Sequence, residues 1–259
     1  VHSCLRLVQV KVVYHERYRE VYAYDPAAQP GRIESIYDEL QGRFEFVEPE
    51  PAKEEDLLLV HSKDHVNYVR AHKQTYDVAV LAVGGAIKAS ELAFEGEPAF
   101  GLIRPPGHHA SRDSSWGFCY FNNIAVSIEK LRRRGEIQRA LIVDVDLHYG
   151  DGTASIFSSV SDVAYFPVEG WNREQYLSNL AKRLSTEESF DIVAVSAGFD
   201  RHEQDWGGLL KTEDYHTIGK MIKEFAEKTC GGKRYALLEG GYNHSVLGKN
   251  VRSLLDGLK

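Results

Sequence analysis

The sequence predicts an α/β fold with a central, mostly parallel sheet and helices on both of its faces. Short apolar segments typical of buried strands alternate along the chain with longer segments of helical character. This alternation indicates crossover units, in which each helix connects two parallel strands. Polar residues and glycines also follow four of the strand-like segments. Sites form at the carboxyl ends of strands in such sheets, so we expect one functional site there.

The individual elements are predicted from their residue patterns. Residues 79–94 are apolar and small, as in a buried helix, and residues 123–134 end in a basic turn before Gly135, as helices often do. Compact apolar runs predict the strands. In chain order we expect a short strand at 10–14, a helix at 79–94, a strand at 99–103, a helix at 123–134, a strand at 140–145, a helix starting within 153–158, a strand at 162–166, a helix at 173–184, a strand at 191–196, a helix at 212–228 and a strand at 234–238.

Length and composition indicate one large globular domain. No Pro/Gly/Ser-rich linker divides the 259 residues, so a single domain is expected over 1–259, with residues 1–10 partly outside it and without a role. Hydrophobic residues make up 43% and charged residues 27%, which is typical of a folded protein. We expect no membrane span and no targeting leader, because no apolar run is long enough to cross a bilayer and no charged-then-apolar segment opens the chain.

Charge and cysteine content restrict the partners and the compartment. The net charge of −7 argues against a nucleic-acid-binding surface and weakly favours cationic substrates or basic protein tails. Cys4, Cys119 and Cys230 are odd in number and far apart, as expected of reduced thiols. A cytoplasmic location is therefore expected.

A cluster of acids and one histidine follows the apolar run at 141–143. Alternate residues of an extended chain share a face, so Asp144, Asp146 and His148 are expected to point the same way. Carboxylate oxygens and an imidazole nitrogen are ligands of catalytic divalent metals. A solvated strand end with a helix cap at Asp151 or Thr153 would explain one acid only. The pattern thus favours a metal site.

Three further strand ends carry residues suited to chemistry. His108 and His109 follow the strand at 99–103, and neighbours in an extended segment point to opposite sides, so both cannot be core histidines. A histidine near a metal-bound water can accept its proton, and a carboxylate partner sets its tautomer. Asp144 and Asp151 remain available as such partners once Asp146 and His148 are ligands.

The third ligand and an oxyanion donor are expected from the last two strand ends. Asp200 follows the strand at 191–196 and supplies the third ligand, although a simple turn residue is also common there. Tyr242 follows Gly240 and Gly241, which leave its surroundings free of bulk. Its phenol could donate a hydrogen bond to a developing oxyanion, the alternative being a packed aromatic.

Five segments together resemble the zinc-dependent histone deacetylase superfamily, with its prokaryotic acetoin-utilisation and acetylpolyamine amidohydrolase members. They occur in the order of the family and span most of the chain: RPPGHHA (104–110), GFCYFNN (117–123), DVDLHYGDGT (144–153), SAGFD (196–200) and EGGYN (239–243). The first and third are specific, whereas SAGFD is weak. The resemblance implies an arginase-like α/β fold.

The resemblance also implies a role for each matching residue. Asp146, His148 and Asp200 would bind Zn²⁺, which two carboxylates and one imidazole do not distinguish from Fe²⁺. His109 would act as general base and then acid, supported by Asp151, while His108, supported by Asp144, would assist electrostatically. Tyr242 would polarise the scissile carbonyl.

A structural K⁺ would be held by oxygens of Asp144, Asp146 and His148. The substrate channel would be lined by Gly117, Phe118, Trp206, Gly240 and Gly241. Arg32 would lie near an internal product-release channel, unless it is a surface arginine opening a helix.

The sequence departs from the family pattern around the expected channel. Tyr149 replaces a second histidine, on a side expected to face away from the metal. The loop after Phe166 is short, which leaves two possibilities for the second channel wall: Phe166 replaces it, or the pocket is wider or open on one side. The rim acid falls at Lys63 or Asp64, in ambiguous register. Trp206 occupies the mouth of the channel, where relatives specialised for polyamines can have an acid that recognises a distant ammonium. Glu203 or Asp205 would have to serve in place of that acid.

The expected function is a zinc-dependent deacylase that hydrolyses the amide of an N-acetylated amine through metal-activated water. The amine could belong to an acetyl-lysine peptide, an acetylpolyamine or a small metabolite. A ureohydrolase shares the fold but needs two bridged manganese ions, and Gly150 occupies a place where it needs an acid. A non-catalytic binder of acylated lysine would have lost Tyr242, His109 or a ligand. A scaffold with an incidental metal site is the third alternative. The sequence does not define the oligomeric state.

Overall fold

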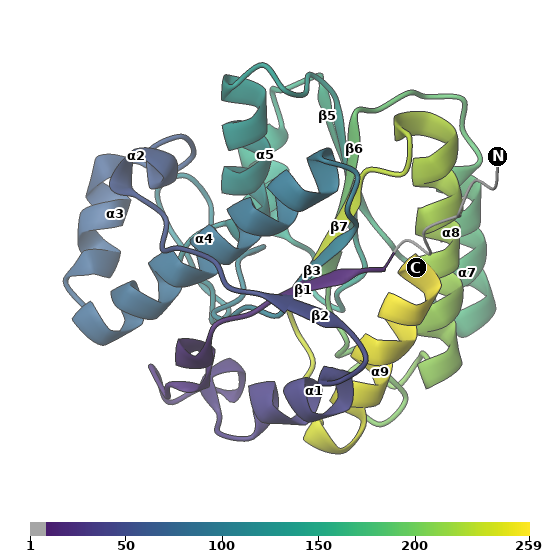
Figure 1. Cartoon of the computed structure of the whole chain (residues 1–259), viewed down its shortest axis with the longest axis horizontal. Helices are drawn as coiled ribbons and strands as arrows, with labels where there is room; N and C mark the ends of the chain where they lie inside the picture. Colours follow the sequence, from purple (N-terminus) through teal and green to yellow (C-terminus); the bar gives the residue numbers. More distant parts are fainter. Residues whose placement is uncertain (1–8) are drawn as a thin grey trace, which may run out of the picture.

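A seven-stranded parallel sheet forms the centre of the protein, in the order β2-β1-β3-β7-β6-β4-β5 (Figure 1). The computed structural model describes residues 9–259. The strands are β1 (Lys11–Val13), β2 (Glu45–Val47), β3 (Ala99–Gly101), β4 (Ala140–Asp144), β5 (Val163–Pro167), β6 (Ile192–Ala197) and β7 (Arg234–Leu238). The predicted α/β class with a parallel sheet is confirmed.

Helices cover both faces of the sheet. They are α1 (Arg32–Leu40), α2 (Glu54–Leu57), α3 (Lys63–Arg70), α4 (Lys73–Phe94), α5 (Asn123–Arg133), α6 (Asp151–Phe157), α7 (Arg173–Leu184), α8 (Thr212–Cys230) and α9 (His244–Leu258), with short 3₁₀ turns at Glu16–Arg19 and Pro26–Ala28. Figure 1 shows α4 and α5 on one side of the sheet, and α8 and α9 on the other. The sheet is therefore buried on both faces, and every residue of β3, β4, β6 and β7 is buried.

The predicted elements are present, with small differences at their ends. Helix α4 begins at Lys73 rather than at residue 79, and β3 ends at Gly101 instead of residue 103. Helix α8 continues to Cys230, where Gly231 takes the left-handed conformation and ends it. Asn122 caps α5 by accepting a hydrogen bond from the Ala125 N–H.

Several elements were not predicted from the sequence. They are β2 and the helices α1, α2, α3 and α9. Strand β2 has only three residues, too few for an alternation to be recognised. Helix α9 does carry a signal, because its buried residues Leu247, Val251, Leu254 and Leu258 recur at helical spacing.

The order of the sheet brings the predicted strand ends together. Strand β6 lies between β4 and β7, with Asp144 opposite Ser196, and Ser196 opposite Leu237. The segments that follow these strands carry the acid cluster, Asp200 and Tyr242, while the histidine pair follows β3, the neighbour of β7. All four chemical groups therefore meet at one edge of the sheet.

The expectations of reduced cysteines and of no membrane span can be compared with the structure only for residues 9–259. Cys119 and Cys230 are free thiols, while Cys4 lies outside the described residues. Within residues 9–259, no helix has the length and apolar character needed to span a bilayer.

Candidate metal centre and active site

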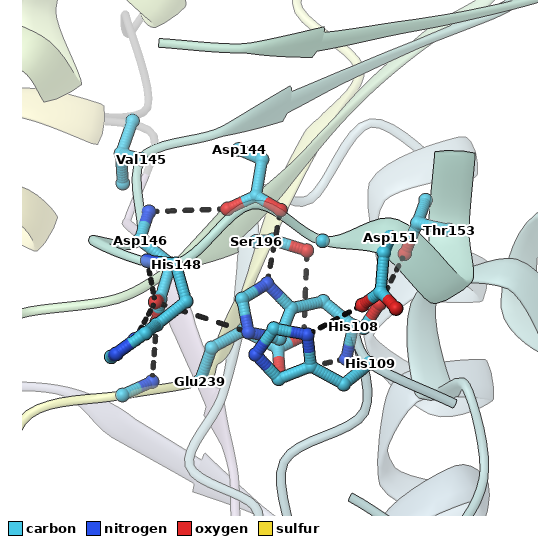
Figure 2. A network of polar contacts seen from close by, with 12 residues as sticks. His108, His109, Asp144, Val145, Asp146, His148, Asp151, Thr153, Ser196 and Glu239 are labelled. Atoms are coloured by element: carbon cyan, nitrogen blue, oxygen red, sulfur yellow. Dashed lines mark hydrogen bonds and ion pairs between the residues drawn. The ribbon is translucent and has the colours of Figure 1, made fainter. Parts of the chain in front are cut away.

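Asp146, His148 and Asp200 form a cluster at the carboxyl ends of β4 and β6. One potential ligand atom from each lies within 4.8 Å of the others. The Nδ1 atom of His148 is 3.2 Å from Asp146 Oδ1 and 2.9 Å from Asp200 Oδ2. Strand β4 ends at Asp144, so the three residues do not lie along one extended strand as expected. Only Asp146 and His148 join the cluster, and the Asp144 carboxylate turns towards His108, as Figure 2 shows.

The donor set fits a divalent cation. Asp146 and Asp200 are buried side by side, and within residues 9–259 the buried Asp200 Oδ2 makes no polar contact other than the one with His148 Nδ1 at 2.9 Å. Burial and the neighbouring Asp146 charge raise the pKa of Asp200 to about 6. Hydrogen bonds with Asp146 and Asp200 raise the pKa of His148 to about 10. A positive charge between the carboxylates would relieve their repulsion.

Glycines let the backbone approach these carboxylates closely. A Cβ atom on Gly240 would lie 2.6 Å from Asp146 Oδ2 and 2.8 Å from Asp200 Oδ2, and one on Gly198 would also clash with Asp146. The Gly240 N–H donates to Asp146 Oδ2 at 2.8 Å, and the Leu147 N–H donates to Asp200 Oδ1 at 2.9 Å. These two backbone donors thus bind the carboxylate oxygens that His148 Nδ1 does not contact.

His108 is paired with a buried carboxylate. Its Nδ1 lies 3.1 Å from Asp144 Oδ2, which also accepts a hydrogen bond from the Tyr165 hydroxyl at 2.9 Å. Burial lowers the pKa of His108, but the charges of Asp146 and Asp144 outweigh it and raise this pKa well above its ordinary value. These carboxylates therefore favour the protonated, positively charged form of His108 as long as no metal ion neutralises Asp146.

His109 is paired with Asp151, the first residue of α6. Its Nδ1 lies 2.7 Å from Asp151 Oδ1, so Nε2 is the ring nitrogen left free (Figure 2). Burial and the charge of His108 lower the pKa of His109, while Asp151 opposes this shift. The imidazole is therefore neutral at neutral pH and suited to accept a proton.

Trp116 is a site residue that sequence reasoning missed. Its indole packs against the His109 ring in a tilted arrangement with centroids 4.0 Å apart, and its Nε1 donates to Asp151 Oδ2 at 2.9 Å. The next residue, Gly117, packs so closely that a Cβ there would lie 2.5 Å from His109 Cδ2. Phe118 follows with φ +68°, the only non-glycine in residues 9–259 with a positive φ. Trp116 directly precedes the GFCYFNN segment, and this position is the only sequence signal that could have identified it as a site residue.

Tyr242 is held by the loop that carries Asp200. The N–H groups of Tyr242 and Asn243 both donate to Asp205 Oδ2 at 2.8 Å, and the Trp206 indole stacks on the Tyr242 ring at 4.0 Å. Burial raises the pKa of Tyr242 well above its usual value, so the phenol stays protonated. Because Asp205 Oδ1 also accepts the Trp206 N–H, this carboxylate serves the backbone and is not a free rim acid.

A narrow pocket of about 120 Å³ gives access to the site. Its walls are Pro106, His108, His109, Trp116, Gly117, Phe118, His148, Trp206, Gly240 and Tyr242. The structure thus brings together Gly117, Phe118, Trp206 and Gly240 of the predicted channel. Gly241 is absent from the wall, and its N-terminal neighbour Gly240 takes the place nearest the carboxylates.

Of the two possibilities for the second channel wall, the one that places Phe166 there is wrong. Successive residues of a strand point to opposite faces, and Tyr165 uses the inner one to reach Asp144. Phe166 therefore faces the other way, where its ring centre lies 5.9 Å from the Arg183 guanidinium carbon. Lys63 and Asp64 are both exposed and outside the pocket wall, with Lys63 paired to Glu54. Tyr149 packs against Tyr165, with ring centres 5.9 Å apart.

Two buried charged residues support the site from behind. Glu239 accepts hydrogen bonds from the N–H groups of Gly107 at 2.7 Å and His108 at 3.2 Å, and burial raises its pKa to about 7. Arg32 opens α1 but is not a surface residue, because it is fully buried. It donates to the carbonyls of Glu239 and Gly241, and its guanidinium carbon lies 5.5 Å from the Tyr242 ring centre.

The chain matches the histone deacetylase domain over residues 26–176 and 168–258. The protein belongs to the histone deacetylase family. It is similar to a "Probable deacetylase" of Methanothermobacter thermautotrophicus, with 35% identity covering 82% of this chain and 78% of the relative. A "Histone deacetylase-like amidohydrolase" of Pseudomonas aeruginosa is 28% identical over 83% of this chain and 71% of its own.

Membership of the histone deacetylase family is also supported by a solved structure. The crystal structure of the HDA15 HD domain superposes with a TM-score of 0.85 at 25% identity, covering 96% of this chain and 89% of that domain. The predicted arginase-like α/β fold and the assignment to a family of hydrolytic enzymes are confirmed.

Proposed function

We propose that this protein is a zinc-dependent deacylase that hydrolyses the amide bond of an N-acetylated amine. The main support is the placement of the His109–Asp151 pair and Tyr242 around one pocket that also exposes His148 of the metal cluster. When bound by Asp146, His148 and Asp200, Zn²⁺ would polarise the scissile carbonyl and lower the pKa of the attacking water. Fe²⁺ would suit the same three ligands.

The residues around the cluster divide the proton transfers between them. His109 accepts the proton of the attacking water at Nε2, because Asp151 holds Nδ1 as the protonated nitrogen. The same nitrogen then donates this proton to the leaving amine. His108, paired with Asp144, stabilises negative charge near the metal. The protonated phenol of Tyr242 donates a hydrogen bond to the developing oxyanion.

The pocket favours a slender substrate. Its wall combines Phe118, Trp116 and Trp206 with the backbone of glycines, which suits an unbranched aliphatic stem ending in a small acyl group. An acetyl-lysine peptide, an acetylpolyamine or a small acetylated metabolite meets this description. We place Arg32 behind Tyr242 as a contact for the released acid, because it is buried beside that ring.

The remaining assignments follow the same reasoning. We propose a single domain and a cytoplasmic location, the latter because Cys119 and Cys230 are both free thiols. We propose no nucleic-acid partner, because the chain is acidic.

The test is acetate release from an acetyl-lysine peptide by metal-stripped protein, before and after adding one equivalent of Zn²⁺. Activity that appears only with zinc is expected. The Asp146→Ala and Asp200→Ala variants should bind no stoichiometric zinc, while Asp38→Ala, on the exposed face of α1, should bind it normally. Zinc binding without any deacylation of peptide, polyamine or longer acyl substrates would instead indicate a non-catalytic binder of acylated amines.

A further inference from the structure

The side chain of Arg201 binds three backbone carbonyls directly beside the metal cluster. Its Nε donates to the carbonyl of Asp146 at 3.0 Å, and its Nη2 lies 3.3 Å from the carbonyls of Leu147 and Val168. Its guanidinium carbon is 5.0 Å from the ring centre of Tyr176. Because these carbonyls follow β4 and β5 while Arg201 follows β6, one cation joins three neighbouring strand ends.

The guanidinium acts on the ligand carboxylates through two peptide groups. The peptide between Asp146 and Leu147 accepts from Arg201 at its carbonyl and donates from its N–H to Asp200 Oδ1 at 2.9 Å. The peptide between Leu147 and His148 accepts from Arg201 in the same way and donates to Asp146 Oδ1 at 2.8 Å. Each peptide dipole thus lies between a positive guanidinium and a negative carboxylate, which polarises and strengthens both hydrogen bonds.

This arrangement does not fit the structural K⁺ that the family resemblance implies. The Asp146 carbonyl is bound by Arg201, and the Asp144 carbonyl accepts the Val168 N–H at 2.8 Å. The Asp144 carboxylate is likewise engaged, by the Asp146 N–H, by Tyr165 and by His108. A second cation placed among the oxygens of Asp144, Asp146 and His148 would be repelled by the guanidinium at a few ångströms.

We propose that Arg201 is a positioning residue that replaces a structural monovalent cation, holding the loop of Asp146 and His148 in its metal-binding conformation. A covalently attached guanidinium needs no ion from solution, and its planar fork suits carbonyls from several segments. The proposal depends on the metal centre proposed above but not on the reaction. Zinc affinity and thermal stability therefore test it independently of deacylation.

The first measurement compares the wild-type protein in KCl and in tetramethylammonium chloride of equal ionic strength. Tetramethylammonium is too large to enter a ring of carbonyls and lacks donors. The Zn²⁺ dissociation constant and the melting temperature should be the same in the two salts. A Zn²⁺ affinity that rises several-fold with K⁺, in a saturable manner, would show that the protein binds the ion and would overturn the proposal.

The second measurement uses Arg201→Ala. In tetramethylammonium chloride its Zn²⁺ affinity should fall about ten- to hundredfold, the range for loss of a group that orients metal ligands. Added K⁺ should restore part of this loss, because the truncated side chain frees the carbonyls. Wild-type affinity of this variant in both salts would contradict the proposal.

Two further variants complete the comparison. Arg201→Lys keeps a cation without the fork and should lose less affinity than Arg201→Ala. Arg183→Ala removes an arginine of α7 that binds Thr186 and Glu188 and contacts none of the metal-binding residues, and its Zn²⁺ affinity should equal that of the wild type in both salts. If Arg201→Ala does not fold, the Zn²⁺ affinities of the wild type in the two salts and of Arg201→Lys still test the proposal. Normal zinc binding without deacylation would reject the proposed function and leave this inference standing.

Discussion

Trp116 contacts both members of the His109–Asp151 pair, with its ring centre 4.0 Å from that of the imidazole and its indole Nε1 donating to the carboxylate at 2.9 Å. The Asp151 side chain is 48% exposed, so water competes for its oxygens and its rotamer is not set by packing. Binding of Oδ2 by the indole leaves Oδ1 directed at His109. Trp116 is itself 56% exposed, which a role in core packing would not explain.

Replacement of Trp116 by Phe should lower kcat about tenfold with little change in KM. The substitution keeps an aromatic ring on His109 but removes the donor to Asp151, and one hydrogen bond to a charged group has about this effect. In an Asp151→Ala background the same substitution should change kcat less than about twofold, because contacting residues are not additive. An equal loss of kcat in the wild-type and Asp151→Ala backgrounds would show that Trp116 only lines the pocket and does not act through Asp151. Trp171→Phe, at a tryptophan that is 94% exposed, is the control.

Replacement of Tyr242 by Phe should slow turnover by roughly two to three orders of magnitude, the scale for loss of an oxyanion-hole donor. Stacking on Trp206 involves the ring alone and should persist, so zinc content should be unchanged. Steady-state kinetics and metal analysis of the same preparation check both points. Normal turnover would exclude the role assigned to this phenol.

The acid limb of kcat/KM should lie below pH 6.5 in the zinc-loaded enzyme. Burial and His108 lower the pKa of His109, so its neutral, basic form persists to lower pH than in a free histidine. Asp151 opposes that shift, and Asp151→Asn should therefore move the acid limb to still lower pH while reducing the maximal rate about ten- to hundredfold. A limb that moves to higher pH in this variant would contradict the assignment of His109 as the titrating base.

Acid should destabilise the fold through His61, a buried residue outside the pocket. Its Nδ1 donates to the Ser111 carbonyl and its Nε2 accepts the Asn122 N–H, so the folded protein holds it neutral. Burial lowers its pKa to about 3, against 6.5 for the unfolded chain. Between these values only the unfolded chain binds the proton, so the stabilisation present above pH 6.5 is lost as pH falls, by about 2 kcal/mol at pH 5.

The His61→Gln variant isolates this effect. It should unfold at lower urea than wild type at pH 7, and its free energy of unfolding should fall less between pH 7 and pH 5. Glu239, whose raised pKa gives the opposite slope, is present in both proteins and cancels in the comparison. Parallel pH profiles for the two proteins would show that His61 does not titrate on unfolding.

The sequence allowed six of the seven strands and the residues of the candidate site to be predicted, because both leave local signals. The strand at 234–238 and the helix at 173–184 were predicted to the residue, since apolar runs and periodicity depend only on neighbours. Asp144 and Asp151 were expected as partners of His108 and His109, and each contacts the expected ring. Their catalytic roles remain predictions.

Contacts between distant segments could not be predicted in this way. Trp116 reaches Asp151 across 35 residues, and Asp205 reaches the Tyr242 backbone across 37, with no periodicity linking them. The error at Phe166 had a different cause. A channel wall was assigned by position along the chain, whereas the alternation of side chains in β5 decides which of Tyr165 and Phe166 faces the site.

The loop from Asp200 to Trp206 has a consequence for how the enzyme would fail on heating. This loop supplies one metal ligand at its start. At its end, Asp205 accepts hydrogen bonds from the backbone at Tyr242, and Trp206 stacks on the Tyr242 ring. Local opening of these few residues would release the ligand and the phenol in a single event. Loss of metal and loss of activity would then occur in the same thermal transition. At each temperature the molecules would be either fully active or inactive, with no partly active form.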